Sequence, residues 1–233
     1  MMVSQRSHML GTSQGLNDDS GARVGAHSSP TDKPPVTVEV IAAHVVVKSY
    51  LHTLHEAMLK VPGRAIDDAV AALRHARAKD ATIVFAGNGG SASTASHFAA
   101  DLAKNTVHHV QGRFRTVCLS DNIALFSAWS NDEGYENGFL EGVKTHLRPI
   151  DVLVAISGSG NSENILRAAR FAREIGCIVI GLTGFDGGKL RSIASINLTV
   201  PAATIEEAED GHLILNHAFC TAIRHLDQSG VPA

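Results

Sequence analysis

The chain has 233 residues, of which 44% are hydrophobic and 18% are charged, and its formal net charge is −3. This balance is typical of a globular protein, and the length allows one large domain with a tail or two small domains. The lack of a basic excess argues against direct contact with nucleic acid. No apolar run approaches the ~20 residues that a membrane helix needs, so we expect no membrane partner.

The cysteines and the N-terminus indicate the compartment. Cys118, Cys177 and Cys220 are odd in number and far apart, which predicts reduced thiols rather than a disulfide framework. The N-terminus lacks the apolar core of an export signal. We therefore expect a cytoplasmic protein.

The first part of the chain differs from the rest in composition. Residues 1–36 are rich in Ser, Gly, Asp and Pro and contain few large apolar residues, which predicts a disordered tail. Residues 37–233 are expected to form a single domain. This domain should begin with a pair of helices, because apolar residues recur with helical spacing up to residue 61 and again over 63–80.

Beyond residue 80, short β-branched runs alternate with stretches of helical spacing. The sequence predicts strands over 81–87, 116–120, 151–157, 177–184 and 196–201, and helices over 91–106, 123–132, 137–147, 162–176, 187–194 and 204–228. This alternation predicts an α/β fold, a three-layer sandwich with a central parallel sheet flanked by helices. Ligands of such sheets bind beyond the carboxyl ends of the strands, where two glycine-rich loops of this chain fall.

The sequence SGSGNS connects a predicted strand to a predicted helix and has the composition of a phosphate loop. The hydroxyls of Ser157, Ser159 and Ser162 can donate to phosphate oxygens, and Gly158 and Gly160 let the backbone come close. Free N–H groups at the helix start attract an anion. The loop has no lysine, so it differs from the nucleoside triphosphate loop and suits a phosphate monoester. The alternative is a flexible turn with serine caps.

A second loop of the same construction follows the strand over 81–87. Asn88, Gly89 and Gly90 turn the chain, and Ser91 can cap the next helix or donate to a ligand. Both loops therefore fall at the edge of the sheet where such folds bind their ligands.

Two helices carry side chains suited to a metal or to acid–base chemistry. His97 and Asp101 are four residues apart, so they lie on one helix face. Glu209 and His217 are two helical turns apart on the last helix and can face one way. Two imidazoles and two carboxylates suit an ion like zinc. The alternatives are a surface His–Asp pair and a histidine buried in the core.

With these motifs in place, the chain resembles the SIS (sugar isomerase) domain family and, within it, the phosphoheptose isomerases. The resemblance covers about residues 40–227 and is carried by GNGGSASTASHFAADL, WSNDEGYENGF, ISGSGNSENILRAARFAREIG, IGLTGFDGGKL and HLILNHAFC. It implies a flavodoxin-like fold without a nucleotide, a sugar phosphate as the small-molecule partner, and a homotetramer whose sites are built from more than one subunit.

The resemblance also implies roles for individual residues. The implied substrate contacts are Asn88, Gly89, Gly90, Ser91, Asp101, Asn131, Asp132, Ser157, Gly158, Ser159, Ser162 and Glu209. The implied ligands of one zinc ion per subunit are His97, Asp101, Glu209 and His217. As a carboxylate and an imidazole, Asp101 and His217 are the expected catalytic base and acid.

We therefore expect an aldose–ketose isomerase that converts sedoheptulose 7-phosphate into D-glycero-D-manno-heptose 7-phosphate through an enediol. Asp101, Glu209 and Gly158 depart from the Glu, Gln and Thr that the resemblance assigns to these positions. Two alternatives stay open: a non-catalytic scaffold that resembles the DnaA initiator-associating protein, and a sensor that binds a sugar phosphate without converting it.

Overall fold

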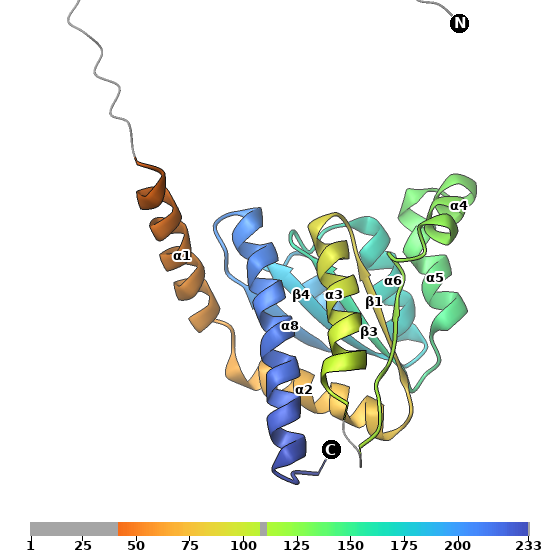
Figure 1. Cartoon of the computed structure of the whole chain (residues 1–233). Helices are drawn as coiled ribbons and strands as arrows, with labels where there is room; N and C mark the ends of the chain where they lie inside the picture. The colour runs from red at the N-terminus through yellow and green to blue at the C-terminus, as the bar shows by residue number, and fades with distance from the viewer. Residues whose placement is uncertain (1–41, 108–110, 233) are drawn as a thin grey trace, which may run out of the picture. The chain divides into compact units, whose positions relative to one another are not determined.

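The computed structural model describes residues 42–107 and 111–232 (Figure 1). The predicted tail over 1–36 and the beginning of the first predicted helix lie outside the described residues. In the part of the chain that is described, no helix is both long and apolar enough to cross a membrane.

The described elements follow the predicted order, with ends that differ by a few residues. The strands are β1 (Thr82–Gly87), β2 (Arg115–Cys118), β3 (Val152–Ser157), β4 (Ile178–Gly184) and β5 (Ile196–Val200). The helices are α1 (Ala43–Leu59), α2 (Gly63–Ala78), α3 (Gly90–Asn105), α4 (Ile123–Glu133), η1 (Tyr135–Asn137), α5 (Gly138–His146), α6 (Glu163–Glu174), α7 (Leu190–Ile193) and α8 (Ile205–Gln228).

The five strands form one parallel sheet in the order β2-β1-β3-β4-β5. From β1 the chain adds β2 on one side, and it adds β3, β4 and β5 on the other. The direction of winding therefore reverses between β1 and β3. The crevice beyond the carboxyl ends of two such strands is where open α/β sheets bind ligands.

Both faces of the sheet are covered, because successive strand side chains point to opposite sides. In β1, Ile83 and Phe85 pack with α2, α3 and α8, whereas Val84 and Ala86 pack with α5, α6 and α7. Figure 1 shows α3 and α8 side by side on the near face of the sheet. The predicted three-layer α/β fold is confirmed.

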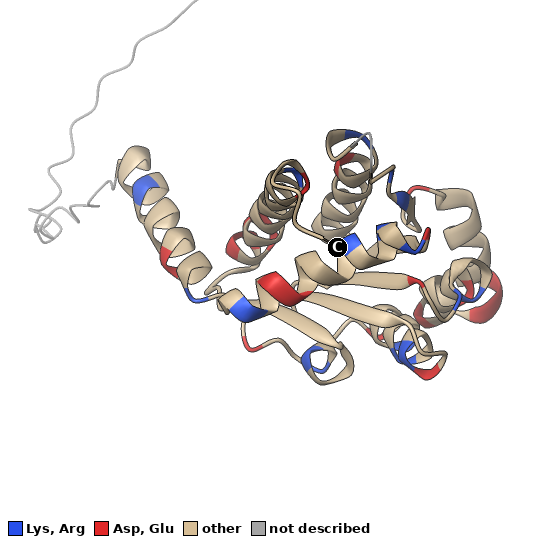
Figure 2. Cartoon of the chain, turned by 90° about the horizontal axis from the view of Figure 1, so that it is seen from below, with Lys and Arg blue, Asp and Glu red and all other residues tan. Residues whose placement is uncertain are grey.

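Charged residues avoid the centre of the sheet. Figure 2 shows that Lys, Arg, Asp and Glu are spread over the helices and loops, with both signs mixed. The strands β1, β3, β4 and β5 contain none of them. Their mostly apolar or small side chains fit strands that are largely buried on both faces.

A buried ion network fixes the C-terminal half of α8 to α2. Asp227 Oδ1 accepts hydrogen bonds from Arg77 Nη2 at 2.7 Å and from Arg74 Nε at 3.3 Å. The Arg77 guanidinium also lies over the Phe114 ring, 4.6 Å from its centroid. Removing one partner of a buried ion pair leaves an uncompensated charge, so losing either arginine should destabilise the packing of α8 on α2.

Candidate functional site

A small hollow of about 150 Å³ lies beyond the carboxyl ends of β1 and β3. Its lining comes from the loop after β1, the loop after β3 and the first turns of α8: Asn88, Ser91, Ile156, Ser157, Gly158, Ser159, Ser162, Ile205 and Glu209. We call this hollow the cradle. Its lining includes no lysine or arginine, as the sequence of the loop predicts.

Two helices begin at the cradle without a side-chain cap. Gly89 and Ser162 occupy the N-cap positions of α3 and α6, and neither provides a capping hydrogen bond. In contrast, Thr204 caps α8 by accepting from the backbone N–H of Glu207. The Ser162 hydroxyl instead accepts from Ser157 Oγ at 3.3 Å. The N–H groups of the first two residues of each helix therefore remain free to bind an anion, whereas those of Ala92 and Ile165 are bonded within the protein.

The loop after β3 is tied down rather than flexible. The Gly184 N–H donates to Gly158 O at 2.8 Å, and the Leu190 N–H donates to Gly160 O at 2.9 Å. Gly160 has a φ of +64°, and a Cβ there would collide with Gly187 O. These contacts favour a preformed phosphate loop over a flexible turn.

Glu209 brings a carboxylate into the cradle. Its side chain is half-buried and lies against Gly90, where an added Cβ would overlap the carboxylate. The start of α3 carries a partial positive charge, which favours an anion at this place. Glu209 and a bound phosphate would therefore face the same helix start.

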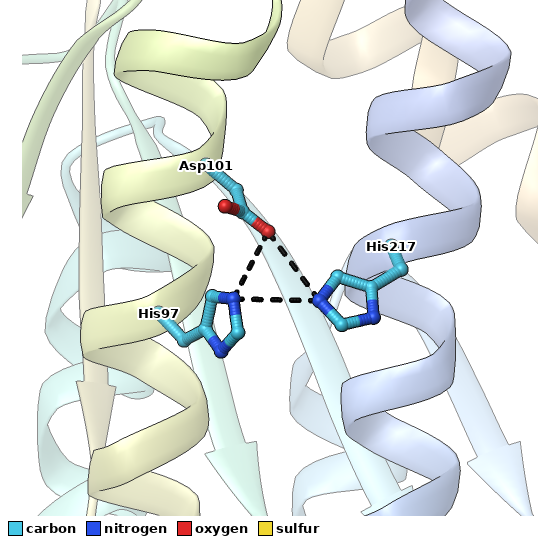
Figure 3. Close-up of side chains that lie close together, drawn as sticks. All are labelled: His97, Asp101 and His217. Atoms are coloured by element: carbon cyan, nitrogen blue, oxygen red, sulfur yellow. Dashed lines mark hydrogen bonds and ion pairs between the residues drawn. The ribbon is translucent and has the colours of Figure 1, made fainter.

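A second cluster of side chains lies between α3 and α8. Asp101 Oδ2 is 3.3 Å from His97 Nε2 and 3.5 Å from His217 Nε2. The two Nε2 atoms are 3.3 Å apart. Figure 3 shows the three side chains pointing toward one another across the gap between the helices. They line a hollow of about 280 Å³ together with Asn105, Cys220, Thr221 and Arg224.

The geometry of this cluster fits a zinc ion. The three ligand atoms lie within 4.8 Å of one another. In a tetrahedral site with bonds of about 2.0–2.1 Å, neighbouring ligand atoms are about 3.3–3.4 Å apart. The observed separations are close to this spacing, so His97, Asp101 and His217 form one face of a tetrahedron. Two imidazoles and a carboxylate are common zinc ligands, and the fourth position is left for another ligand.

The fourth predicted ligand, Glu209, lies outside this group. It precedes His217 by eight residues, which corresponds to about 12 Å along the axis of α8. Its carboxylate lines the cradle and not the hollow around the cluster. The structure therefore brings together three of the four predicted metal ligands and places Glu209 with the predicted phosphate loop.

Two asparagines that sequence reasoning missed hold the Asp101 carboxylate. Asn105 Nδ2 donates to Oδ1 at 2.7 Å, and Asn216 Nδ2 donates to Oδ2 at 3.3 Å. Asn216 is fully buried. Such outer contacts orient a metal ligand or catalytic carboxylate. The spacing of four residues between Asp101 and Asn105 could have indicated the first contact, whereas no sequence signal indicates the second.

The predicted sugar contacts on α4 line neither hollow. Asn131 and Asp132 are exposed, and Asn131 Nδ2 donates to Asp132 Oδ1 at 2.9 Å. Tyr135, from the same sequence motif, does reach the cradle, because its hydroxyl donates to Asn88 Oδ1 at 2.9 Å. The motif therefore contacts the cradle through its tyrosine.

Comparison with known proteins agrees with this architecture. The sequence profile of the SIS domain matches residues 48–184. The phosphoheptose isomerase of Aliarcobacter butzleri is 33% identical over 198 residues, which cover 82% of this chain and 96% of that protein. The solved phosphoheptose isomerase GmhA from Neisseria gonorrhoeae superposes with a TM-score of 0.71 and 31% identity, over 78% of this chain and 96% of that one.

A relative of higher identity is matched over a shorter part. The lincomycin biosynthesis protein LmbN of Streptomyces lincolnensis is 46% identical over 151 residues, or 60% of this chain. This chain spans about half the length of LmbN, 55%. The relatives that match over nearly their whole length are enzymes, which supports the predicted isomerase class. The chain belongs to the SIS domain family.

Proposed function

We propose that this chain is an aldose–ketose isomerase that converts sedoheptulose 7-phosphate into D-glycero-D-manno-heptose 7-phosphate. The observation that carries the proposal is the arrangement of α3 and α8, which hold a cradle without basic residues at one end and a His–Asp–His cluster further along. The phosphoheptose isomerase relatives support the same reaction class.

In this proposal the cradle binds the phosphate ester. The hydroxyls of Ser157, Ser159 and Ser162 and the free N–H groups at the starts of α3 and α6 donate to its oxygens. Binding energy gained at the phosphate, away from the reacting carbons, aligns those carbons with the catalytic groups. A cradle without a lysine or arginine binds the ester weakly enough for the product to leave.

The length of the substrate matches the distance between the two hollows. Gly90 and His97 are seven residues apart on α3, or about 10 Å along the helix axis. Six carbon–carbon bonds of about 1.5 Å span roughly 7–8 Å when extended, and the phosphate ester adds about 2–3 Å. A seven-carbon ketose phosphate in the cradle therefore extends far enough to bring its carbonyl end to the cluster.

The cluster supplies the proton transfers. Asp101 takes the proton from C1 of the ketose while His217 protonates the carbonyl oxygen at C2, which gives the enediol. Asp101 then returns a proton to C2 and the C1 hydroxyl gives its proton to His217, which gives the aldose. Asn105 and Asn216 hold the carboxylate in a fixed orientation for this transfer. A zinc ion on His97, Asp101 and His217 would supply positive charge beside the carbonyl and hydroxyl oxygens. An oxygen of Asp101 or a nitrogen of His217 that binds the ion cannot transfer a proton at the same time, so the ligand and proton-transfer roles of both residues compete.

We further propose a cytoplasmic homotetramer that binds one zinc ion per subunit. Buried free thiols at Cys118, Cys177 and Cys220 fit a reducing compartment. On α1, Val45 is 50% exposed and Leu51 57% exposed, which leaves apolar surface for a neighbouring subunit. Subunit contacts that cover the open cradle and the cluster would exclude water from the reaction.

The proposal is tested by incubating the full chain with sedoheptulose 7-phosphate, with and without Zn²⁺, and following the aldose by NMR. The expected result is aldose formation that depends on the metal. Thermal stabilisation by the sugar phosphate without product would favour a sensor. Capture of the replication initiator without any sugar phosphate binding would favour a scaffold.

A second candidate substrate is a ketose phosphate of another chain length. Asp101 and Glu209 differ from the residues that the resemblance assigns to the isomerases, and LmbN, which is 46% identical over 151 residues, is named as a lincomycin biosynthesis protein and not as a phosphoheptose isomerase. Comparing kcat/KM for shorter and longer ketose phosphates separates the two candidates. If another ketose phosphate is converted with a higher kcat/KM than sedoheptulose 7-phosphate, that sugar is the preferred substrate.

A further inference from the structure

The side chain of Asn88 is held in the cradle by three hydrogen bonds. Its Nδ2 donates to Asn164 Oδ1 at 2.9 Å, and its Oδ1 accepts from Asn164 Nδ2 at 3.0 Å. The Oδ1 atom also accepts from the hydroxyl of Tyr135 at 2.9 Å. Asn164 is only 1% exposed, so these bonds form in a nearly dry environment.

A reciprocal pair of amides is symmetric on its own, because both can turn over together and keep two hydrogen bonds. One backbone group breaks this symmetry. The N–H of Ile165 donates to Asn164 Oδ1 at 2.9 Å. A backbone N–H can only donate, so the Asn164 atom that it contacts must be the oxygen. The Asn164 nitrogen must then face Asn88, and the atom of Asn88 that it contacts must also be an oxygen.

The orientation of Asn88 determines what it offers to a ligand. Its Oδ1 already accepts from Asn164 and Tyr135, which fills both lone pairs. Its Nδ2 uses one hydrogen for Asn164 and keeps the second. Asn88 lines the cradle, so it presents a hydrogen-bond donor there and not an acceptor.

We propose that Asn164 and Tyr135 are positioning residues that lock Asn88 as a fixed donor to the phosphate ester. The inference rests on the proposed function, in which the cradle binds a phosphate. It adds a reason for the cradle to prefer an anion although it lacks basic residues and contains the Glu209 carboxylate. A free amide could turn its oxygen toward the phosphate, and the hydrogen bonds from Asn164 and Tyr135 prevent this unfavourable orientation.

Of the two proposed positioning residues, Tyr135 can be changed with the smaller effect on folding. It is 56% exposed, and its ring packs edge-on against Phe126 with centroids 5.9 Å apart. The change Tyr135→Phe keeps this packing and removes only the hydroxyl. Asn164→Asp keeps the oxygen that accepts from Ile165 and removes the donor to Asn88. Folding of the second variant is checked by its thermal transition.

The experiment measures the Kd for inorganic phosphate by calorimetry, and KM and kcat for sedoheptulose 7-phosphate. Losing one neutral hydrogen bond changes an equilibrium constant by about three- to tenfold. We expect Tyr135→Phe to raise Kd and KM by about this factor and to leave kcat nearly unchanged, because the contact is remote from C1. Asn164→Asp should raise both constants further. The matched control is Tyr50→Phe, which removes a tyrosine hydroxyl that donates to Asp210 outside the cradle.

A double-mutant cycle separates positioning from a general structural role. If Tyr135 acts through Asn88, Tyr135→Phe should have almost no further effect on Kd in an Asn88→Ala background. Additive effects, or a Tyr135→Phe variant with wild-type Kd and KM, would overturn the inference. If the wild type binds phosphate but does not convert the sugar, the proposed function fails and the phosphate measurements still decide the inference. A wild type that binds no phosphate overturns the inference, whereas aldose formation still decides the proposed function.

Discussion

The carboxylate of Glu209 fills the space that a side chain at Gly90 would occupy, so the start of α3 and the first turns of α8 are in direct contact. This contact fixes a negative charge inside a cradle that is otherwise built from hydroxyls and backbone N–H groups. The negative charge of Glu209 repels any phosphate that binds in the cradle. It therefore weakens phosphate binding unless the substrate or a metal ion interacts favourably with the carboxylate.

The first prediction concerns this charge. Glu209→Gln keeps the size of the side chain and removes repulsion worth about 1 kcal/mol, so the cradle should bind inorganic phosphate roughly fivefold more tightly. Calorimetric titration measures the change. The control is Glu206→Gln, which alters an exposed carboxylate of the same helix that does not line the cradle. Unchanged or weaker binding would mean that Glu209 does not repel the ligand.

The second prediction concerns Asp101, the proposed general base. Asp101→Asn should lower kcat by about 10²- to 10⁴-fold, because a positioned general base contributes this much, while KM changes little. The matched control is Asp68→Asn, which removes an exposed carboxylate paired with Arg64 on α2. A variant that retains zinc and wild-type kcat would remove Asp101 from the mechanism.

The third prediction concerns the metal ligands. His97→Ala and His217→Ala should each lose bound zinc, because each deletes one of three ligands that already stand at tetrahedral spacing. Glu209→Ala should retain zinc, because its carboxylate lies in the cradle. Metal analysis of purified protein after dialysis against trace zinc measures the content. Loss of zinc from Glu209→Ala would instead support the four-ligand site that the family resemblance implies.

The sequence predicts much of this fold because the signals are local. β-branched runs such as ATIVFAG and CIVIGLTG are buried on both faces, and the predicted phosphate loop lies between a strand and a helix start. Strand order was not predicted, because it depends on contacts between segments far apart in the chain. Parallel strands joined by helices nevertheless predict the edge of the sheet where both loops meet.

The candidate site was predicted less completely. Helical spacing correctly brought His97 and Asp101 to one face, but it could not tell whether Glu209 and His217 reach the same point two turns apart. The contact of Glu209 with Gly90 decides this and is not visible in the spacing. Asn164 and Asn216 were missed because an asparagine within a helix carries no local signal for a partner from another element.

The fourth prediction concerns stability at low pH. His212 on α8 is fully buried, and neither ring nitrogen has a hydrogen-bond partner. Burial lowers its pKa from 6.5 to about 4. The Thr183 backbone acts in the opposite direction but does not reach hydrogen-bonding geometry, so burial dominates. The neutral ring therefore supports the folded state above pH 6.5, and this contribution is lost as the pH falls toward 4.

This loss amounts to about 3 kcal/mol of unfolding free energy between pH 6.5 and 4. His212→Leu, which cannot be protonated, should flatten the decrease over this range. The control is His75→Gln, which replaces an exposed histidine on α2 and should leave the slope unchanged. Denaturant unfolding at several pH values measures the slope, and equal slopes for wild type and His212→Leu would refute the prediction.

Conversion of sedoheptulose 7-phosphate in D₂O, followed by NMR, tests the proposed division of roles directly. In that division the cradle binds the phosphate ester and the His–Asp–His cluster transfers the protons of the sugar. We expect an aldose phosphate that carries deuterium at C2, formed by the wild type and at least about 10²-fold more slowly by Asp101→Asn. This expectation is contradicted if the zinc-loaded wild type forms no aldose, or if Asp101→Asn forms it at the same rate.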